Sequence, residues 1–288
     1  MERRALALAL AVLVLGACSR AKEGALVHIG QPSLPKSDMT SMTFSRLGCY
    51  GTCPVYTLTF SRGDAAMYDG RFFVDKIGKY SGEIDFDLVA AWLDSQNVDD
   101  YAGEYGNNVT DAEPLTLTIT RANRNVVIKS SDTGSLPIRV RGVIAAIDGF
   151  ANDVRWKPAG AIDSYLGYFL NDNAPGELYA LYMIPGHAAA DAIGYSHLTP
   201  GVKCKADAFA NDQSEISLHL AGSRVIAREK SYYRDVGESG LEVPTEVASE
   251  PGGLSIGIGA QKRSYRRVTW REYLSEDNAM YRRCHPEK

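Results

Sequence analysis

The sequence predicts an α+β protein in which an antiparallel sheet with two helices is followed by a β-rich second half. Runs of alternating, β-branched residues recur along the chain, most clearly at 115–120, and are typical of strands. Two stretches, 87–95 and 139–151, carry apolar residues at helical spacing. After Pro158 strand patterns dominate, and the terminal stretch 269–280 again has helical spacing. We therefore expect an α+β domain at 41–157 and a β-rich domain at 158–288.

The chain begins with a targeting segment, residues 1–17. Arg3 and Arg4 supply a positive start, and an apolar run at 5–15 is too short to span a bilayer. The following Leu-Gly-Ala-Cys resembles a bacterial lipoprotein box, in which Cys18 becomes the acylated (palmitate-bearing) first residue. An ordinary secretory signal peptide with an incidental cysteine is the alternative. The sequence thus predicts a lipid-anchored lipoprotein of the bacterial cell envelope.

The residues after Cys18 predict where the anchored chain resides. Ser19, rather than Asp, resembles lipoproteins that are sent to the outer membrane, here facing the periplasm. Residues 18–40 contain Gly, Pro, Ser and Lys with little periodicity and predict a lipidated tether, although 26–29 could begin a short strand. Removal of the signal peptide lowers the net charge from −4 to −5, because Arg3, Arg4 and Glu2 are lost. This mild acidity argues against nucleic acid as a partner.

Residues 48–56, Gly-Cys-Tyr-Gly-Thr-Cys-Pro-Val-Tyr, carry the densest local signal after the signal peptide. A bridge between Cys49 and Cys53 needs Cα atoms about 4.4–6.8 Å apart, whereas an extended chain separates them by about 13 Å. A turn is therefore required, and Gly51 and Pro54 are residues that favour one. A structural disulfide is one interpretation; a redox pair and a metal site are the others.

These residues carry a family resemblance. The pattern Cys-x-Gly-x-Cys-Pro-x-Tyr, here from Cys49 to Tyr56, is similar to that of DUF6438, a bacterial domain family of unknown function. The resemblance covers 44–156. The family also tends to place an Asp before a strand, as Asp111 lies before 115–119 here. It implies a fold but no activity.

The elements of 41–157 follow in order. Strands are predicted at 43–46, 55–60, 66–68, 79–84, 115–120 and 125–130, with hairpin turns at Arg62-Gly63-Asp64, Asp69-Gly70 and Ala122-Asn123-Arg124. Asp85 is a predicted N-cap for the helix at 87–95, with Leu88, Trp92 and Leu93 on one side. The helix at 139–151 repeats Val140, Val143, Ile144, Ile147 and Phe150.

In 158–288 strands are predicted at 177–184, 202–209, 215–220, 224–229 and 254–260. Residues 187–194 read as a short helix, 235–253 as a long exposed loop, and 269–280 as a terminal helix. Of the three pairings open to the remaining four cysteines, we favour Cys49–Cys53 with Cys204–Cys284.

A few further polar residues could serve a function. His187, Asp191 and His197 could ligate a metal or act as an acid–base pair, but their spacing also fits surface residues. Asp111 is either a turn residue or a polar group beside the cysteine turn. Cys204 with His285 is a weaker nucleophile–base pair.

A basic cluster lies near the end of the chain, interleaved with Tyr265 and Trp270. It is either a solvated face balanced by Glu272 and Glu276 or a contact surface for anionic envelope material. The cluster comprises Lys262, Arg263, Arg266, Arg267 and Arg271.

No nucleophile elbow, phosphate-binding loop or zinc-protease motif is present in the sequence. We therefore expect a non-catalytic binding or structural module, without a cofactor or metal. Its partners are the membrane, through the lipid, and another envelope protein or a cell-wall polymer. The alternative is a thiol-dependent redox factor or enzyme that uses Cys49 and Cys53.

Overall fold

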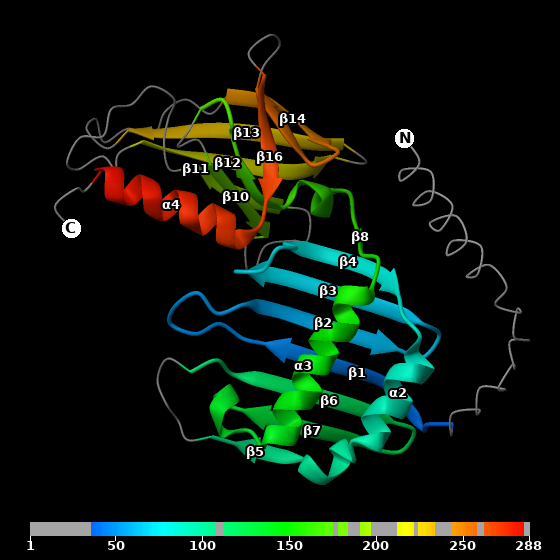
Figure 1. The fold of residues 1–288 in the computed structure, drawn as a ribbon. Coiled ribbons are helices and arrows are strands. Elements are labelled where there is room, and N and C mark those ends of the chain that lie inside the picture. The colour runs from blue at the N-terminus through cyan, green and yellow to red at the C-terminus, as the bar shows by residue number, and fades with distance from the viewer. Residues whose placement is uncertain are drawn as a thin grey trace, which may run out of the picture. The chain divides into compact units, whose positions relative to one another are not determined.

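The structure is a computed structural model that describes residues 36–106, 112–174, 178–183, 191–196, 212–221, 224–233, 243–257 and 262–284. Two sheets and three α-helices make up this part of the chain, which is a mixed α+β fold of β-rich character (Figure 1).

The first sheet has the strand order β5-β7-β6-β1-β2-β3-β4-β8. All of its pairs are antiparallel except β5 with β7. Its strands are β1 (Met39–Arg46), β2 (Val55–Ser61), β3 (Ala65–Phe72), β4 (Gly78–Glu83), β5 (Gly103–Tyr105), β6 (Leu115–Arg121), β7 (Asn125–Ser130) and β8 (Lys157–Pro158).

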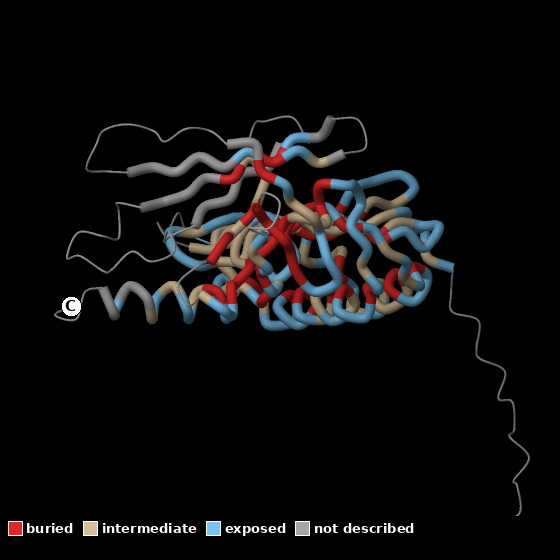
Figure 2. The backbone as a smooth tube through the Cα atoms, turned by 90° about the horizontal axis from the view of Figure 1, so that it is seen from above, coloured by how far each residue is buried: buried red, intermediate tan, exposed pale blue. Residues whose placement is uncertain are grey.

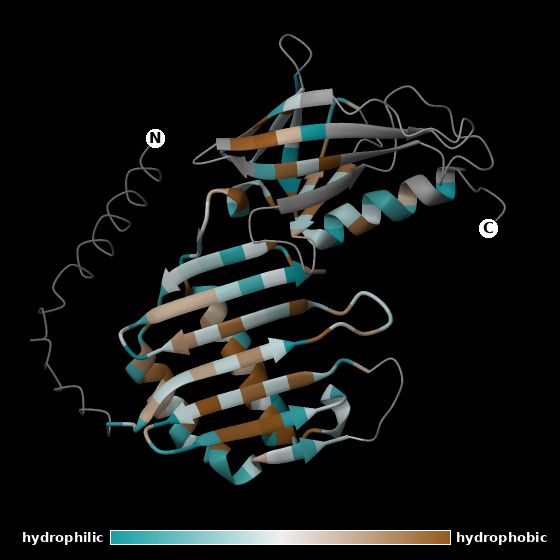
Figure 3. Cartoon of the chain, turned by 180° about the vertical axis from the view of Figure 1, so that it is seen from behind, coloured by the Kyte–Doolittle hydropathy of each residue, from teal (hydrophilic) through white to brown (hydrophobic). Residues whose placement is uncertain are grey.

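Two helices, α2 (Phe86–Ser95) and α3 (Ile138–Asp153), lie on one face of this sheet (Figure 1). Strand residues alternate between this face and the open one, so hydrophobic and hydrophilic positions alternate along the strands (Figure 3). Hydroxyl side chains gather on the open face, where Ser45 bonds Thr57 at 3.1 Å. The core lies between sheet and helices, as the buried segments in Figure 2 show.

Helix α2 has the predicted N-cap, Asp85, although it begins one residue earlier than predicted, at Phe86. The Asp85 carboxylate accepts a hydrogen bond from the Leu88 amide at 3.0 Å, which satisfies a free N–H of the first turn. The predicted apolar face is partly wrong, because Leu88 is 48% exposed. Phe86, Val89, Ala90 and Leu93 are the buried residues instead. Helix α3 buries Val140, Val143, Ile144 and Ile147, as predicted.

Two predicted features of the first sheet need correction. The tether does not extend to residue 40, because Met39 starts β1 and is fully buried. Asp69-Gly70 does not form a hairpin turn, since β3 continues to Phe72. Gly70 serves close packing instead: a Cβ there would lie 1.9 Å from the Lys76 carbonyl oxygen.

The second sheet closes on itself in the order β10-β11-β12-β13-β14-β15-β16-β9, with β9 pairing both β10 and β16. Its strands are β9 (Gly167–Leu170), β10 (Leu178–Met183), β11 (Asp191–Ser196), β12 (Asp212–Ala221), β13 (Arg224–Tyr233), β14 (Val243–Glu250), β15 (Gly253–Gly257) and β16 (Arg263–Val268). Helix α4 (Trp270–Cys284) follows β16, where a terminal helix is predicted.

Two predictions in this region are wrong. Residues 191–196 form β11 rather than part of a helix, because they pair with β10 and β12 along their length. Residues 243–250 form β14 rather than a loop, and pair with β13 and β15. The predicted strand at 202–209 lies outside the described residues.

Asp163, in the 3₁₀ turn Ile162–Tyr165, bonds the backbone of the first sheet. Its carboxylate accepts hydrogen bonds from the amides of Lys79 and Gly160, each at 2.8 Å, and the residue is 6% exposed. Burial raises the pKa of Asp163, although both amide donors act in the opposite direction.

Replacing Asp163 by Asn is expected to lower the free energy of unfolding by about 1–3 kcal/mol, because the amide nitrogen that replaces one carboxylate oxygen cannot accept the hydrogen bond made there. The folded state holds its proton more tightly than the unfolded state, so stability should fall as the pH rises from about 3.9 to the raised pKa. Chemical denaturation at pH 4 and pH 7 should show that Asp163→Asn lacks this pH-dependent part of the free energy of unfolding. Asp153→Asn, at an exposed position, is the control; equal losses in both variants would contradict the role.

Candidate functional site: an aromatic cavity beside a disulfide-closed loop

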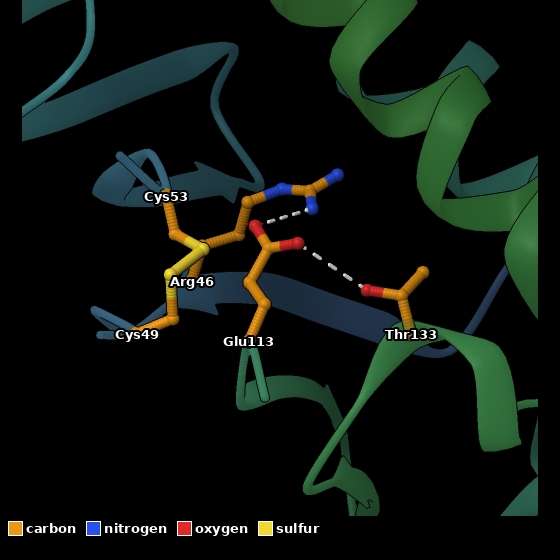
Figure 4. The surroundings of a disulfide bond; sticks show 5 residues. All are labelled: Arg46, Cys49, Cys53, Glu113 and Thr133. Carbon is orange, nitrogen blue, oxygen red and sulfur yellow. Dashed lines mark hydrogen bonds and ion pairs between the residues drawn. A yellow bond between two sulfur atoms is a disulfide. The ribbon is translucent and has the colours of Figure 1, made fainter. Parts of the chain in front are cut away.

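The cysteine motif forms the loop between β1 and β2. A disulfide joins Cys49 and Cys53, whose Cα atoms are 5.6 Å apart. Gly51 has a φ of 156°, and its amide bonds the Cys49 carbonyl at 2.9 Å. The loop thus returns the chain directly from Arg46, the last residue of β1, to the start of β2 (Figure 4).

Arg46 is the centre of an ionic network beside this loop. Its guanidinium contacts Glu113 at 2.9 Å and Asp148 of α3 at 3.0 Å, and its Nε donates to the Tyr56 hydroxyl at 2.9 Å. Thr133 donates to the other oxygen of Glu113 at 3.4 Å (Figure 4). The Arg46 side chain is only 14% exposed, so these partners replace much of its hydration.

The electrostatics of the network keep Arg46 charged and Tyr56 neutral. Burial opposes the charge on Arg46, but Tyr56, Asp148 and Glu113 together raise its pKa. Burial and the Asp148 carboxylate raise the pKa of Tyr56, although Arg46 lowers it. The phenol therefore remains protonated and donates its hydrogen bond to Asp148.

A row of aromatic rings continues from this network along the helix-covered face of the sheet. Tyr56 stacks on Tyr68 with ring centroids 5.6 Å apart, and Tyr68 meets Trp156 at 5.7 Å. Phe73 meets Trp270, the first residue of α4, at 6.2 Å and 72°. The Trp270 amide also donates to Asp75 at 3.1 Å, which fixes this helix end on the turn between β3 and β4.

These rings line a half-open cavity of about 250 Å³. Its aromatic walls are Tyr56, Tyr68, Phe73, Trp156 and Trp270. Its polar lining residues are Asp75, Lys76, Asp148 and Asn152. Small-molecule sites combine apolar walls with a few fixed polar groups in this way.

Tyr68 has a hydroxyl that bonds no other residue of the described structure, although its ring makes contacts on both sides. Burial raises the pKa of Tyr68. Tyr68, a lining residue of the cavity, therefore keeps a neutral hydroxyl that can both donate and accept.

Of the other cysteines, histidines and aspartates predicted as site residues, only Asp191 and Cys284 fall within the described ranges. Cys18, Asp111, His187, His197, Cys204 and His285 lie outside the described residues. Asp191 begins β11, and Cys284 ends α4. Within the described ranges, no group of three or more His, Cys, Asp or Glu side chains could hold a metal ion. In that same part of the chain, no helix is long and apolar enough to cross a membrane.

The basic cluster near the end of the chain is engaged in local bonds. Lys262 pairs with Glu246 at 2.7 Å, and Arg266 contacts both Asp172 and Glu272 at 3.0 Å. The Arg267 guanidinium donates to the Ser164 carbonyl at 2.7 Å, and burial lowers its pKa. The balance with Glu272 that the sequence suggests is thus present.

Sequence reasoning missed the polar half of this site. Arg46 and Asp148 were detectable as charged residues at inward positions: Arg46 is two residues after buried Phe44, and Asp148 lies four after buried Ile144. A charged side chain on an apolar face requires a partner of opposite charge. Because Arg46 is positive and Asp148 is negative, each is a candidate partner for the other.

The fold and site define an α+β domain in which helices cover one sheet face and enclose an aromatic cavity beside a buried ionic network. Residues 40–151 match the family model of DUF6438, a domain of unknown function, which confirms the sequence resemblance in this part of the chain. The matched residues include the disulfide, Arg46 and the three residues that its guanidinium contacts, Tyr56, Glu113 and Asp148. No curated protein matches this chain at a significant level.

Proposed function

We propose that this chain is a non-catalytic binding module of the bacterial cell envelope, tethered through a lipid on Cys18, with the aromatic cavity as its ligand site. The observation that carries the proposal is the cavity itself: five aromatic side chains line about 250 Å³ beside a carboxylate that Arg46 and Tyr56 hold. Because these groups are fixed before a ligand enters, little ordering is required on binding.

The protonation states of the cavity favour binding over catalysis. A general acid or base works best with a pKa near the operating pH. Burial raises the pKa of Tyr56 and of Tyr68, which moves both values further above neutral pH. Asp148 is bound by the guanidinium of Arg46 and by the hydroxyl of Tyr56, which leaves it a positioned acceptor.

The envelope location rests on the sequence at Cys18 and is tested separately. Replacing Cys18 by Ser should abolish labelling with radioactive palmitate and move the protein from the membrane to the soluble fraction. Replacing Ser19 by Ala is the control, because it leaves the acylated thiol in place. Retention of label and membrane association in Cys18→Ser would overturn the anchoring.

The binding role is tested through the three tryptophans of the chain. Trp156 and Trp270 line the cavity, whereas Trp92 packs against Phe150 between α2 and α3. In a ¹H–¹⁵N spectrum of the full chain, solubilised envelope fractions should shift the indole signals of Trp156 and Trp270 and leave that of Trp92. Trp→Phe variants assign the three signals. If no envelope fraction shifts the two cavity indoles, the binding role is wrong.

The alternative, redox chemistry at Cys49 and Cys53, stays a prediction. Both cysteines are partly exposed, which would admit a thiol partner. Alkylation of free thiols before reduction distinguishes the two roles, because a redox pair would be trapped partly as thiols and a structural clip would not.

A further inference from the structure

We infer that the ligand of the cavity is an uncharged saccharide ring, an inference that rests on the proposed binding function. At about 250 Å³ the cavity lies just below the usual range of ligand pockets, about 300–1,000 Å³. A space of this size fits one ring, such as a single residue of a longer glycan.

The aromatic walls match the faces of such a ring. Trp156 and Trp270 are partly buried, so each presents part of its ring to the cavity. Aromatic faces are electron-rich, and the C–H groups on the face of a sugar ring carry a small positive charge. The nearly perpendicular pair of Phe73 and Trp270 forms a corner that receives both the face and the edge of a ring.

The polar groups supply donors and acceptors in mixture. Asp75 and Asp148 can only accept when ionised, Lys76 can only donate, and Asn152 does both. The hydroxyl of Tyr68, without a partner among the described residues, can also do both. Sugar hydroxyls donate and accept in the same way, whereas a quaternary ammonium group does neither.

The charge of the cavity selects against charged ligands. Arg46 neutralises only one of its two carboxylates, Asp148 and Glu113, so the network retains about one negative charge. This charge repels phosphates and acidic sugars. A cationic ligand would in turn be repelled by Lys76, which also lines the cavity. A neutral, hydrogen-bonding ligand avoids both penalties.

Titration of the full chain with defined probes tests the inference. The detergent is a polyoxyethylene ether, because maltoside and choline headgroups would compete. Cellobiose and N,N′-diacetylchitobiose are the neutral probes, and choline and glucuronate are the charged comparators. We expect at least one neutral saccharide to shift the indole signals of Trp156 and Trp270, and neither charged probe to do so.

Tyr68→Phe removes only the hydroxyl and should raise the Kd of that saccharide about three- to tenfold. Tyr105→Phe is the matched control, since its hydroxyl bonds the Tyr101 carbonyl at the opposite end of the sheet. Asn152→Ala is a second test. Because Asn152 is exposed on α3, the substitution should leave stability nearly unchanged, and it should also weaken binding.

The outcomes separate this inference from the proposed function. Choline binding without saccharide binding would overturn the ligand class and leave the binding role intact. The same follows if envelope fractions shift the cavity indoles while no purified saccharide does. A saccharide Kd that is unchanged in both Tyr68→Phe and Asn152→Ala would also overturn the inference. If neither the fractions nor any probe shifts the indoles, both proposals fall together.

Discussion

Replacing Arg46 by Met should lower the free energy of unfolding by about 3 kcal/mol, because it leaves the carboxylates of Glu113 and Asp148 partly buried without their cation. The guanidinium also lies over the Phe44 ring, 5.3 Å from its centroid, so the loss includes this cation–π contact as well as the ionic bonds. Arg46→Lys should recover only part of it, because an ammonium cannot reproduce the fork that bonds both carboxylates and Tyr56. Urea denaturation measures these differences.

Arg71→Met is the control for this variant. Arg71 is 59% exposed and contacts Asp69 at 3.5 Å, so its loss should cost less than about 1 kcal/mol. The ¹H–¹⁵N spectra used for saccharide binding test the cavity in the same variant. Because Asp148 loses a fixed partner in Arg46→Met, saccharide binding should weaken. Equal stability losses in the Arg46 and Arg71 variants would contradict the network.

The second large effect is expected at Arg121, whose side chain is 8% exposed. Its guanidinium contacts three carboxylates, Asp38 at 2.6 Å and Asp94 and Asp99 at 2.7 Å each. Replacement by Met should lower the free energy of unfolding by about 3 kcal/mol, because three like charges remain together. This network fastens the start of β1 to β6 and α2.

Arg121 also governs the acid response. Burial would raise the pKa of Asp99, but the hydrogen bonds from Arg121 and Arg124 outweigh it and lower that pKa. The stabilisation is therefore complete above about pH 4, the unfolded value, and is lost as the pH falls through the lower folded value.

Thermal unfolding between pH 2 and pH 6 measures this dependence, which should be shallower in Arg121→Met. Arg124→Met is the comparison and should change the dependence less, because Arg124 is 60% exposed and, among the described residues, forms an ion pair only with Asp99. An unchanged acid response in Arg121→Met would contradict the assignment.

Local patterns predicted much of the first sheet, and the errors have physical causes. The predicted face of α2 was wrong because Phe86, its first residue, was left outside the helix, and the buried stripe runs from there through Val89, Ala90 and Leu93. Gly70 indicated a turn by residue type, yet it is required for the close approach of the Lys76 carbonyl. Residue type alone cannot separate these two uses of glycine.

In the second sheet, pairing overrides local composition. Residues 191–194 are Asp-Ala-Ile-Gly, which carry no strong strand preference, but β11 is paired on both edges. The same holds for the Pro- and Glu-containing β14. Strand propensity depends mainly on neighbours, and these neighbours are distant in sequence.

The candidate site was only half predictable. The cysteine loop and Tyr56 fall within one short motif and were singled out. Arg46 and Asp148 are 102 residues apart, one on a strand and one on a helix, so only the fold brings them together. Trp270 and Asp75 are even further apart in the sequence, by 195 residues, yet the Asp75 carboxylate accepts a hydrogen bond from the Trp270 amide.

The five aromatic walls of the cavity come from two different parts of the chain. Three of the five rings, Tyr56, Tyr68 and Phe73, belong to the matched domain at 40–151, whereas Trp156 and Trp270 do not. The matched domain thus supplies one part of the pocket wall, and the residues that follow it supply the rest. Under the proposed binding role, exchanging the residues after 151 is expected to alter selectivity, because it replaces two of the five rings and leaves the disulfide and the ionic network in place.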